Sequence, residues 1–229
     1  MGANAQTTVP TFTAGQVLTA DQQNQSARTG VPVFADSSAR DAAFGGAGEK
    51  TLAEGQLAYL EDTDIVQYYD GSVWASVAPT LQIAVFNETQ AAGTNGGTST
   101  SGSFLKRTLN TTVKNDITGC SIASSVITLA AGTYYVIARA PTNQSGYVQA
   151  KIRNTTDSTD LALSNSGYNP PSTSATIDST IQGFFVLAAQ KTIELQQRVG
   201  TGITTNGLGI AANLGVDEIY SSITIVKVA

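Results

Sequence analysis

Short apolar runs alternate with polar segments along the whole of residues 80–229. The segments between the runs, such as AAGTNGGTSTSG and NPPSTS, are rich in Gly, Asn, Pro and Ser, which supply turn geometry. About eight to ten strands at this spacing predict an all-β domain, a two-sheet sandwich of the jelly-roll kind. The runs expected to form strands are LQIAVFN, SFLKRTLN, SIASSVITL, TYYVIARAP, YVQAKIRN, LALSN, ATIDSTIQGFFVLA, KTIELQQRVG, LGIAANL and IYSSITIVKV.

Two of these runs are apolar on both faces of the expected strand. Tyr134 and Tyr135 point to opposite sides of one strand, and Phe184 and Phe185 do so on another. One face of a sandwich strand fills the core, and its other face ordinarily meets water. We therefore expect these four residues to divide between the core and an interface with other copies of the chain. The alternative is that residues 1–78 cover the outer face.

Residues 31–79 predict a small β-rich module that spaces the two ends of the chain. LAYL, IVQYY and VWASV form three alternating runs, and the dipeptide Asp70-Gly71 between the last two is a strong hairpin signal. Ahead of them, VPVF predicts a strand and Asp36 or Ser37 is placed to cap a short helix. Such a meander buries little apolar surface, so we expect it to lean on other copies or on the next domain.

Residues 1–30 predict an extended tether that carries one short helix. Thr19 is placed to cap a helix over residues 20–28, which is polar on nearly every face and too short to be stable alone. The apolar residues of the segment therefore have no core of their own, and we expect them to anchor the chain by docking on another surface; the alternative is that the segment is disordered. These residues are Phe12, Val17 and Leu18.

The composition excludes several functions. The chain has no His, which removes Ser/His/Asp and Cys/His catalysis and imidazole zinc sites. A net charge of -5 gives no basic field for nucleic acid. Its one cysteine, Cys120, forms no intrachain disulfide and is interpreted as a small buried thiol. No apolar run is long enough to insert in a membrane and no signal peptide is present, so we expect synthesis in a cytoplasm.

The remaining polar residues predict recognition more readily than catalysis. Asp157 and Asp160 share one turn, but two carboxylates fall well short of the six to eight oxygens that calcium needs. We expect no metal, no cofactor and no enzymatic activity. The polar tracts around Tyr147 and Tyr168 are expected at the ends of the sandwich, where these rings are candidate contacts for sugar or peptide.

The order of motifs in residues 80–229 resembles the jelly roll of the tumour-necrosis-factor and complement globular-head family. The most specific match is ITLAAGTYYV, where Leu129, Gly132, Tyr134 and Tyr135 fit the family's corner. The resemblance implies a homotrimer in which one sheet of each protomer packs around the threefold axis. The doubled apolar faces predict the same kind of association independently.

The N-terminal part resembles short segments that begin structural proteins of tailed bacteriophages, among them head fibres, decoration proteins and tail fibres. The matching segments are VPTFTAGQVLTADQQN, GVPVFADSSARDAAF and GQLAYLEDTDIVQYYDGSVW. The resemblance implies a virion protein made in the host cytoplasm, whose partners are itself, a major capsid protein or a tail component, and a host surface glycan or protein. The short chain without a long shaft favours a capsid decoration, cement or head-fibre role. The alternatives are a tail-fibre or tail-tip receptor-binding protein for host attachment and, as a third class, a capsule depolymerase.

Overall fold

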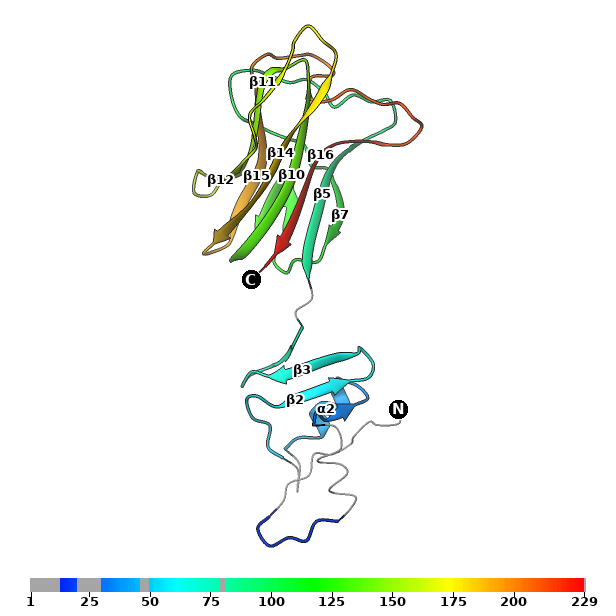
Figure 1. Ribbon diagram of the computed structural model, residues 1–229, viewed down its shortest axis with the longest axis vertical. Helices are drawn as coiled ribbons and strands as arrows, with labels where there is room; N and C mark the ends of the chain where they lie inside the picture. The colour runs from blue at the N-terminus through cyan, green and yellow to red at the C-terminus, as the bar shows by residue number, and fades with distance from the viewer. Residues whose placement is uncertain (1–12, 20–29, 46–49, 79–80, 229) are drawn as a thin grey trace. The chain divides into compact units, whose positions relative to one another are not determined.

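The computed structural model of the protein describes residues 13–19, 30–45, 50–78 and 81–228 (Figure 1). The chain divides into two compact units, Met1–Thr80 and Leu81–Ala229. The helix expected over residues 20–28 and the anchoring residue Phe12 lie outside the described residues.

The N-terminal unit contains one four-stranded sheet in the order β1-β2-β3-β4. Strand β1 pairs with β2 in parallel, and the remaining pairs are antiparallel. This confirms the predicted meander. Its strands are β1 (Val33–Phe34), β2 (Leu57–Leu60), β3 (Ile65–Tyr69) and β4 (Trp74–Ser76).

Local hydrogen bonds fix the helix and the hairpin of this unit. Helix α2 (Ser37–Ala42) begins after Asp36, whose carboxylate accepts a hydrogen bond from the Ala39 amide at 2.8 Å. In the turn between β3 and β4, the Asp70 carboxylate accepts from the amides of Ser72 and Val73, both at 2.8 Å. Of the two predicted helix caps, Asp36 and Ser37, Asp36 is the one that forms, and the predicted hairpin at Asp70 is confirmed.

The N-terminal unit has a small apolar core of its own. Phe34, Ala43, Ala58 and Leu60 are buried, and Trp74 packs against them. The buried guanidinium of Arg40 lies 4.7 Å from the centre of the indole ring of Trp74. Whether this unit also leans on other copies of the chain stays a prediction.

The C-terminal unit is a two-sheet sandwich whose strand order is that of a jelly roll. One sheet runs β14-β10-β16-β5 and the other β12-β11-β15-β9, with β7 added beside β5 and β8 beside β9. Numbered along the chain, the first sheet joins strands one, eight, three and six of these eight, and the second joins two, seven, four and five. This is the double Greek key of a jelly roll, so the predicted fold class is confirmed.

The long strands of this unit cross the whole sandwich (Figure 1). The first sheet comprises β5 (Gln82–Gln90), β7 (Thr111–Asn115), β10 (Gly132–Asn143), β14 (Thr176–Leu187) and β16 (Glu218–Lys227). The second comprises β8 (Ser121–Ala123), β9 (Val126–Leu129), β11 (Gly146–Asn154), β12 (Thr159–Leu163) and β15 (Lys191–Val199), together with the short strands β6 (Leu105–Lys106) and β13 (Gly167–Asn169).

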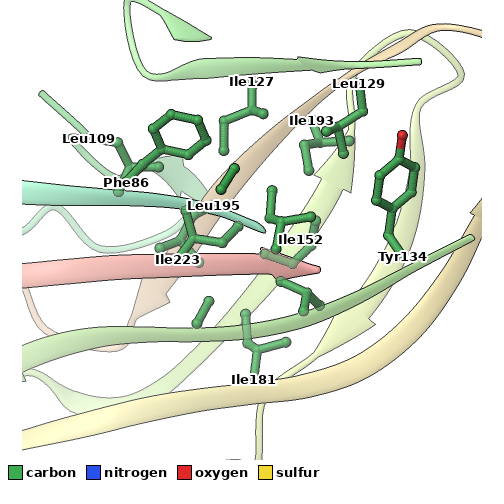
Figure 2. Close-up of a cluster of buried hydrophobic side chains, with 14 of the residues drawn as sticks. Phe86, Leu109, Ile127, Leu129, Tyr134, Ile152, Ile181, Ile193, Leu195 and Ile223 are labelled. Atoms are coloured by element: carbon green, nitrogen blue, oxygen red, sulfur yellow. The ribbon is translucent and has the colours of Figure 1, made fainter. Parts of the chain in front are cut away.

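Alternate side chains of the two sheets interleave to form the core, part of which Figure 2 shows. Tyr134 is fully buried, and its ring lies 5.6 Å from that of Phe185 on the neighbouring strand. The phenolic hydroxyl of Tyr134 donates to the carbonyl oxygen of Ala130 at 3.0 Å, so this polar group is satisfied inside the sandwich.

Two expected strands do not form as predicted. In SFLKRTLN only Leu105–Lys106 pairs as a strand, and the next residue, Arg107, turns its side chain inward to a buried carboxylate. LGIAANL forms no strand. It lies in a connection whose amides at Ala212 and Asn213 donate to the Glu218 carboxylate instead of to a neighbouring strand.

Candidate functional site

The solvent side of the β14-β10-β16-β5 sheet carries an apolar surface, here called the outer face. Cross-strand register places Phe184 opposite Tyr135, Tyr135 opposite Val226, and Val226 opposite Ile83, so one apolar row crosses four strands. The rings of Tyr135 and Phe184 lie 4.7 Å apart. The residues of the outer face are Ile83, Val85, Tyr135, Ile137, Phe184, Val186 and Val226.

The two aromatic pairs divide between the core and the outer face. Tyr134 and Phe185 lie in the core, whereas Tyr135 is half-buried and Phe184 is 65% exposed. The side-chain amide of Gln182 donates a hydrogen bond to the Tyr135 hydroxyl at the same surface. The strands therefore carry large apolar side chains in both directions, and no described residue of the C-terminal unit covers Phe184.

The outer face ends in a polar row. The next cross-strand row after the apolar ones contains Thr180, Arg139, Ser222 and Asn87. The Arg139 guanidinium donates to the carbonyl oxygen of Tyr220 at 3.2 Å. An apolar centre bounded by polar side chains is the usual anatomy of a protein interface.

A second surface, here called the tyrosine groove, lies on the opposite sheet. It is an open hollow of about 530 Å³ whose walls include Phe104, Tyr147, Gln149, Ser166 and Arg198. Buried Val148 and Val199 also line the groove, and no Asp or Glu does. This volume lies within the range of ligand sites, about 300–1,000 Å³.

Strand register brings the two predicted contact residues together, and of the two only Tyr147 lines the groove. Tyr147 on β11 is the direct partner of Tyr168 on β13, and their ring centroids lie 5.1 Å apart. Tyr147 is 76% exposed and Tyr168 is 56% exposed. Gly200 permits the close approach of the loop after β15, since a Cβ atom there would lie 3.1 Å from the Tyr147 amide nitrogen.

Three residues in the walls of the groove were not identified as candidates from the sequence. Gln149 and Arg198 are direct partners across β11 and β15, and Phe104 comes from the segment before β6. The outward parity of Gln149 relative to Tyr147 is visible in the sequence. The pairing with Arg198, by contrast, depends on a register that joins residues far apart in the chain.

The acidic turn considered for calcium is occupied by ion pairs. Asp157 contacts the Lys191 ammonium at 2.7 Å, and Asp160 contacts Lys151 at 2.9 Å and Arg153 at 2.7 Å. These basic partners, Lys191 and Lys151 first, hold the pKa of each carboxyl below its usual value. Among the described residues, no group of three or more His, Cys, Asp or Glu side chains is arranged to hold a metal ion.

The structure describes three further candidate residues, Val17, Leu18 and Cys120, but it does not test the roles predicted for them. Val17 and Leu18 are exposed, so their docking on a particle stays a prediction. Cys120 is half-buried, and burial raises the pKa of its thiol to about 11, which keeps it protonated at neutral pH. None of the helices in the described part of the chain is long and apolar enough to cross a membrane.

Comparisons with known proteins find structural likeness only. No family model matches the chain, and no curated protein matches it. Murine APRIL at pH 5.0 is similar with a TM-score of 0.45 and 9% identity, over 65% of this chain and 100% of that one. The globular domain of a zebrafish complement 1qA protein has a TM-score of 0.41 and 14% identity, over 65% and 96%. The PRD1 vertex protein P5 has a TM-score of 0.40 and 16% identity, over 66% and 100%.

Proposed function

We propose that the protein is a homotrimeric structural component of a tailed-bacteriophage particle, in the form of a capsid decoration or head-fibre protein. Residues 1–30 attach the chain to the particle, and the jelly-roll unit forms a knob. The apolar outer face of the knob is the observation that carries the self-association. The virion assignment is supported by the N-terminal sequence segments that resemble phage structural proteins.

Burial of the outer face supplies the energy for association. Covering one large apolar side chain stabilises by roughly 1.5–3 kcal/mol, and Phe184, Val186 and Ile137 are all exposed in the protomer. Association of the same sheet of each protomer around a shared axis would cover these side chains and close the assembly. The family resemblance implies three protomers around that axis.

Three joined protomers attach more firmly than one. Each tether offers Val17 and Leu18 as exposed apolar side chains, with Phe12 nearby in sequence. When one tether is bound, the others are held near the surface at a high effective concentration, which raises the overall affinity without any new contact. A threefold knob thus converts three weak apolar contacts into a durable attachment.

Light scattering tests the association. The full chain should have a mass three times the 23.6 kDa of the protomer. Phe184→Asp should shift the mass to that of one protomer, since three carboxylates would be placed in an apolar interface. Leu163→Asp is the matched control, because Leu163 is an exposed apolar residue on the opposite sheet, and it should leave the mass unchanged. A folded wild-type protomer at the monomer mass would overturn the proposal.

Particle labelling tests the location. An antibody against the knob should label the heads of purified particles. Deletion of residues 1–30 should leave three protomers in the assembly, at three times the mass of the shortened chain, and remove the assembly from the heads. Label confined to the tail would overturn the decoration role.

The tyrosine groove favours a second candidate, a receptor-binding protein of the tail fibre or tail tip. A preformed groove lined by the exposed ring of Tyr147, with the ring of Tyr168 beside it, suits recognition of a host surface glycan or protein. Tail labelling together with loss of host attachment on deletion of the protein would favour this role. Neither role includes catalysis, so host polysaccharide incubated with the pure protein should keep its chain length.

A further inference from the structure

The tyrosine groove combines an aromatic platform with polar walls. The carbon-bound hydrogens of a sugar ring pack favourably against the negative face of an aromatic ring. Tyr147 offers such a face, because it is 76% exposed and is held on one side by Tyr168. Phe104 adds a second ring, which the ammonium of Lys151 contacts at 4.3 Å from the ring centre.

The one charged side chain in the walls of the groove has no acidic partner. Of the nine Lys and Arg residues within 81–228, seven lie within 4.0 Å of a carboxylate. The two exceptions in this part of the chain are Arg198 and Lys227, and only Arg198 lines the groove. A guanidinium without a carboxylate partner favours a ligand that carries its own negative group.

Strand geometry sets Arg198 and Tyr147 at a useful spacing. Arg198 is the direct partner of Gln149, and Tyr147 lies two residues before Gln149 on the same face of β11. Diagonal neighbours in an antiparallel pair lie about 7–8 Å apart, with a slightly shorter distance between their Cβ atoms. One sugar residue spans this distance, so a ring on Tyr147 brings a carboxylate on its edge to the guanidinium, which binds carboxylates in bidentate fashion.

Hydroxyl-binding groups complete the groove. The side-chain amide of Gln149 donates to the Ser164 carbonyl oxygen at 3.4 Å, which leaves the amide oxygen of Gln149 to accept from a ligand. Ser101 and Ser166 add hydroxyl groups to the walls. The platform is fixed from behind, because the Gly200 amide donates to the Tyr147 carbonyl oxygen at 2.7 Å.

We infer that the tyrosine groove binds an acidic saccharide, with a sugar ring on Tyr147 and a carboxylate on Arg198. This assigns a ligand class that the structural role proposed above does not require. The residues that would hold the sugar and its carboxylate, Tyr147 and Arg198, lie on the sheet opposite the outer face. A peptide ligand is disfavoured because the groove offers shallow rings and hydroxyl partners in place of a deep apolar pocket for an anchoring side chain.

Calorimetric titration of the full chain tests the inference. The probe is an oligogalacturonate, and its neutral methyl ester of the same length is the matched ligand. The acid should bind at least about tenfold more tightly than the ester, a difference of about 1.4 kcal/mol. Arg198→Gln should remove this preference and leave the ester unaffected. Lys227→Gln removes the other cation within residues 81–228 that has no carboxylate partner; it is the matched control and should change neither affinity.

A second set of variants tests the aromatic platform. Tyr147→Ala should weaken both ligands alike, whereas Tyr147→Phe keeps the ring and should retain binding. The inference is overturned if Arg198→Gln keeps the preference for the acid, or if a hexaglutamate peptide binds as tightly as the oligogalacturonate. It is also overturned if oligogalacturonate, oligosialic acid and hyaluronan fragments all fail to bind at millimolar concentration. Light scattering on the same samples measures the number of protomers, so a failure of the homotrimer is distinguished from a failure of saccharide binding.

Discussion

Among single residues, Arg107 and Glu88 stand out because they form an ion pair inside the sandwich. The guanidinium Nη2 atom lies 2.9 Å from the carboxylate Oε2 atom, and the two side chains are only 2% and 1% exposed. Arg107 also donates to the carbonyl oxygen of Pro141 and to the Gln197 side chain, so it joins both sheets. Burial lowers the pKa of Arg107, and its contact with Glu88 acts in the opposite direction.

Removal of the buried carboxylate should be strongly destabilising. Glu88→Ala would leave the Arg107 charge buried without its partner, and the free energy of unfolding should fall by about 3–5 kcal/mol. Asp116→Ala removes one partner of an exposed pair with Lys114 and should cost at most about 1 kcal/mol. Urea unfolding at one fixed protein concentration measures both. Equal losses in the two variants would contradict the structural role of the buried pair.

At the scale of elements, the start of β16 organises two of the loops at one end of the sandwich. The Glu218 carboxylate accepts hydrogen bonds from the backbone amides of Asn213, Ala212 and Gly93, at 2.8, 3.0 and 3.1 Å. These amides stabilise the ionised form and hold the pKa of Glu218 below its ordinary value of 4.5. The loop after β5 and the loop before β16 are thereby tied to one side chain.

This tie should weaken in acid. Because the pKa of Glu218 is lowered in the folded state, its stabilising contribution is present above pH 4.5 and is lost as the pH falls through the lowered pKa. The amide resonances of Gly93, Ala212 and Asn213 should shift together, with a midpoint below 4.5. Glu218→Gln should remove the common transition. A midpoint at or above 4.5 would contradict the assignment.

For the whole molecule, each of the two units has its own core. The buried cluster of the N-terminal unit and that of the C-terminal unit have no residue in common. A unit with its own core and a complete set of paired strands folds independently. The outer face also belongs entirely to the C-terminal unit.

Residues 81–229 alone should therefore fold and keep the association of the full chain. Light scattering should give three times the mass of the shortened protomer, and circular dichroism should show a β protein. A folded but monomeric fragment would place the association in residues 1–80 instead. In that case the outer face would lose its proposed role, although the tyrosine groove would remain.

Local patterns in the sequence predicted the elements that depend on local interactions. The alternation of apolar residues predicted most strands and the sandwich, and short-range capping and turn signals predicted the helix start at Asp36 and the hairpin at Asp70. The two-residue repeat of a strand also predicted that the side chains of Tyr134 and Tyr135 point to opposite faces of the sheet. The anchoring role of Val17 and Leu18 stays a prediction.

Only the tertiary structure decided which face is inside and which distant residues meet. Parity separates Phe184 from Phe185, but sheet packing decides that Phe185 enters the core. Arg107 is buried because its guanidinium pairs with the Glu88 carboxylate inside the sandwich, a contact that the local sequence pattern does not show. Arg198 likewise meets Gln149 through register between strands, which depends on the pairing of whole sheets.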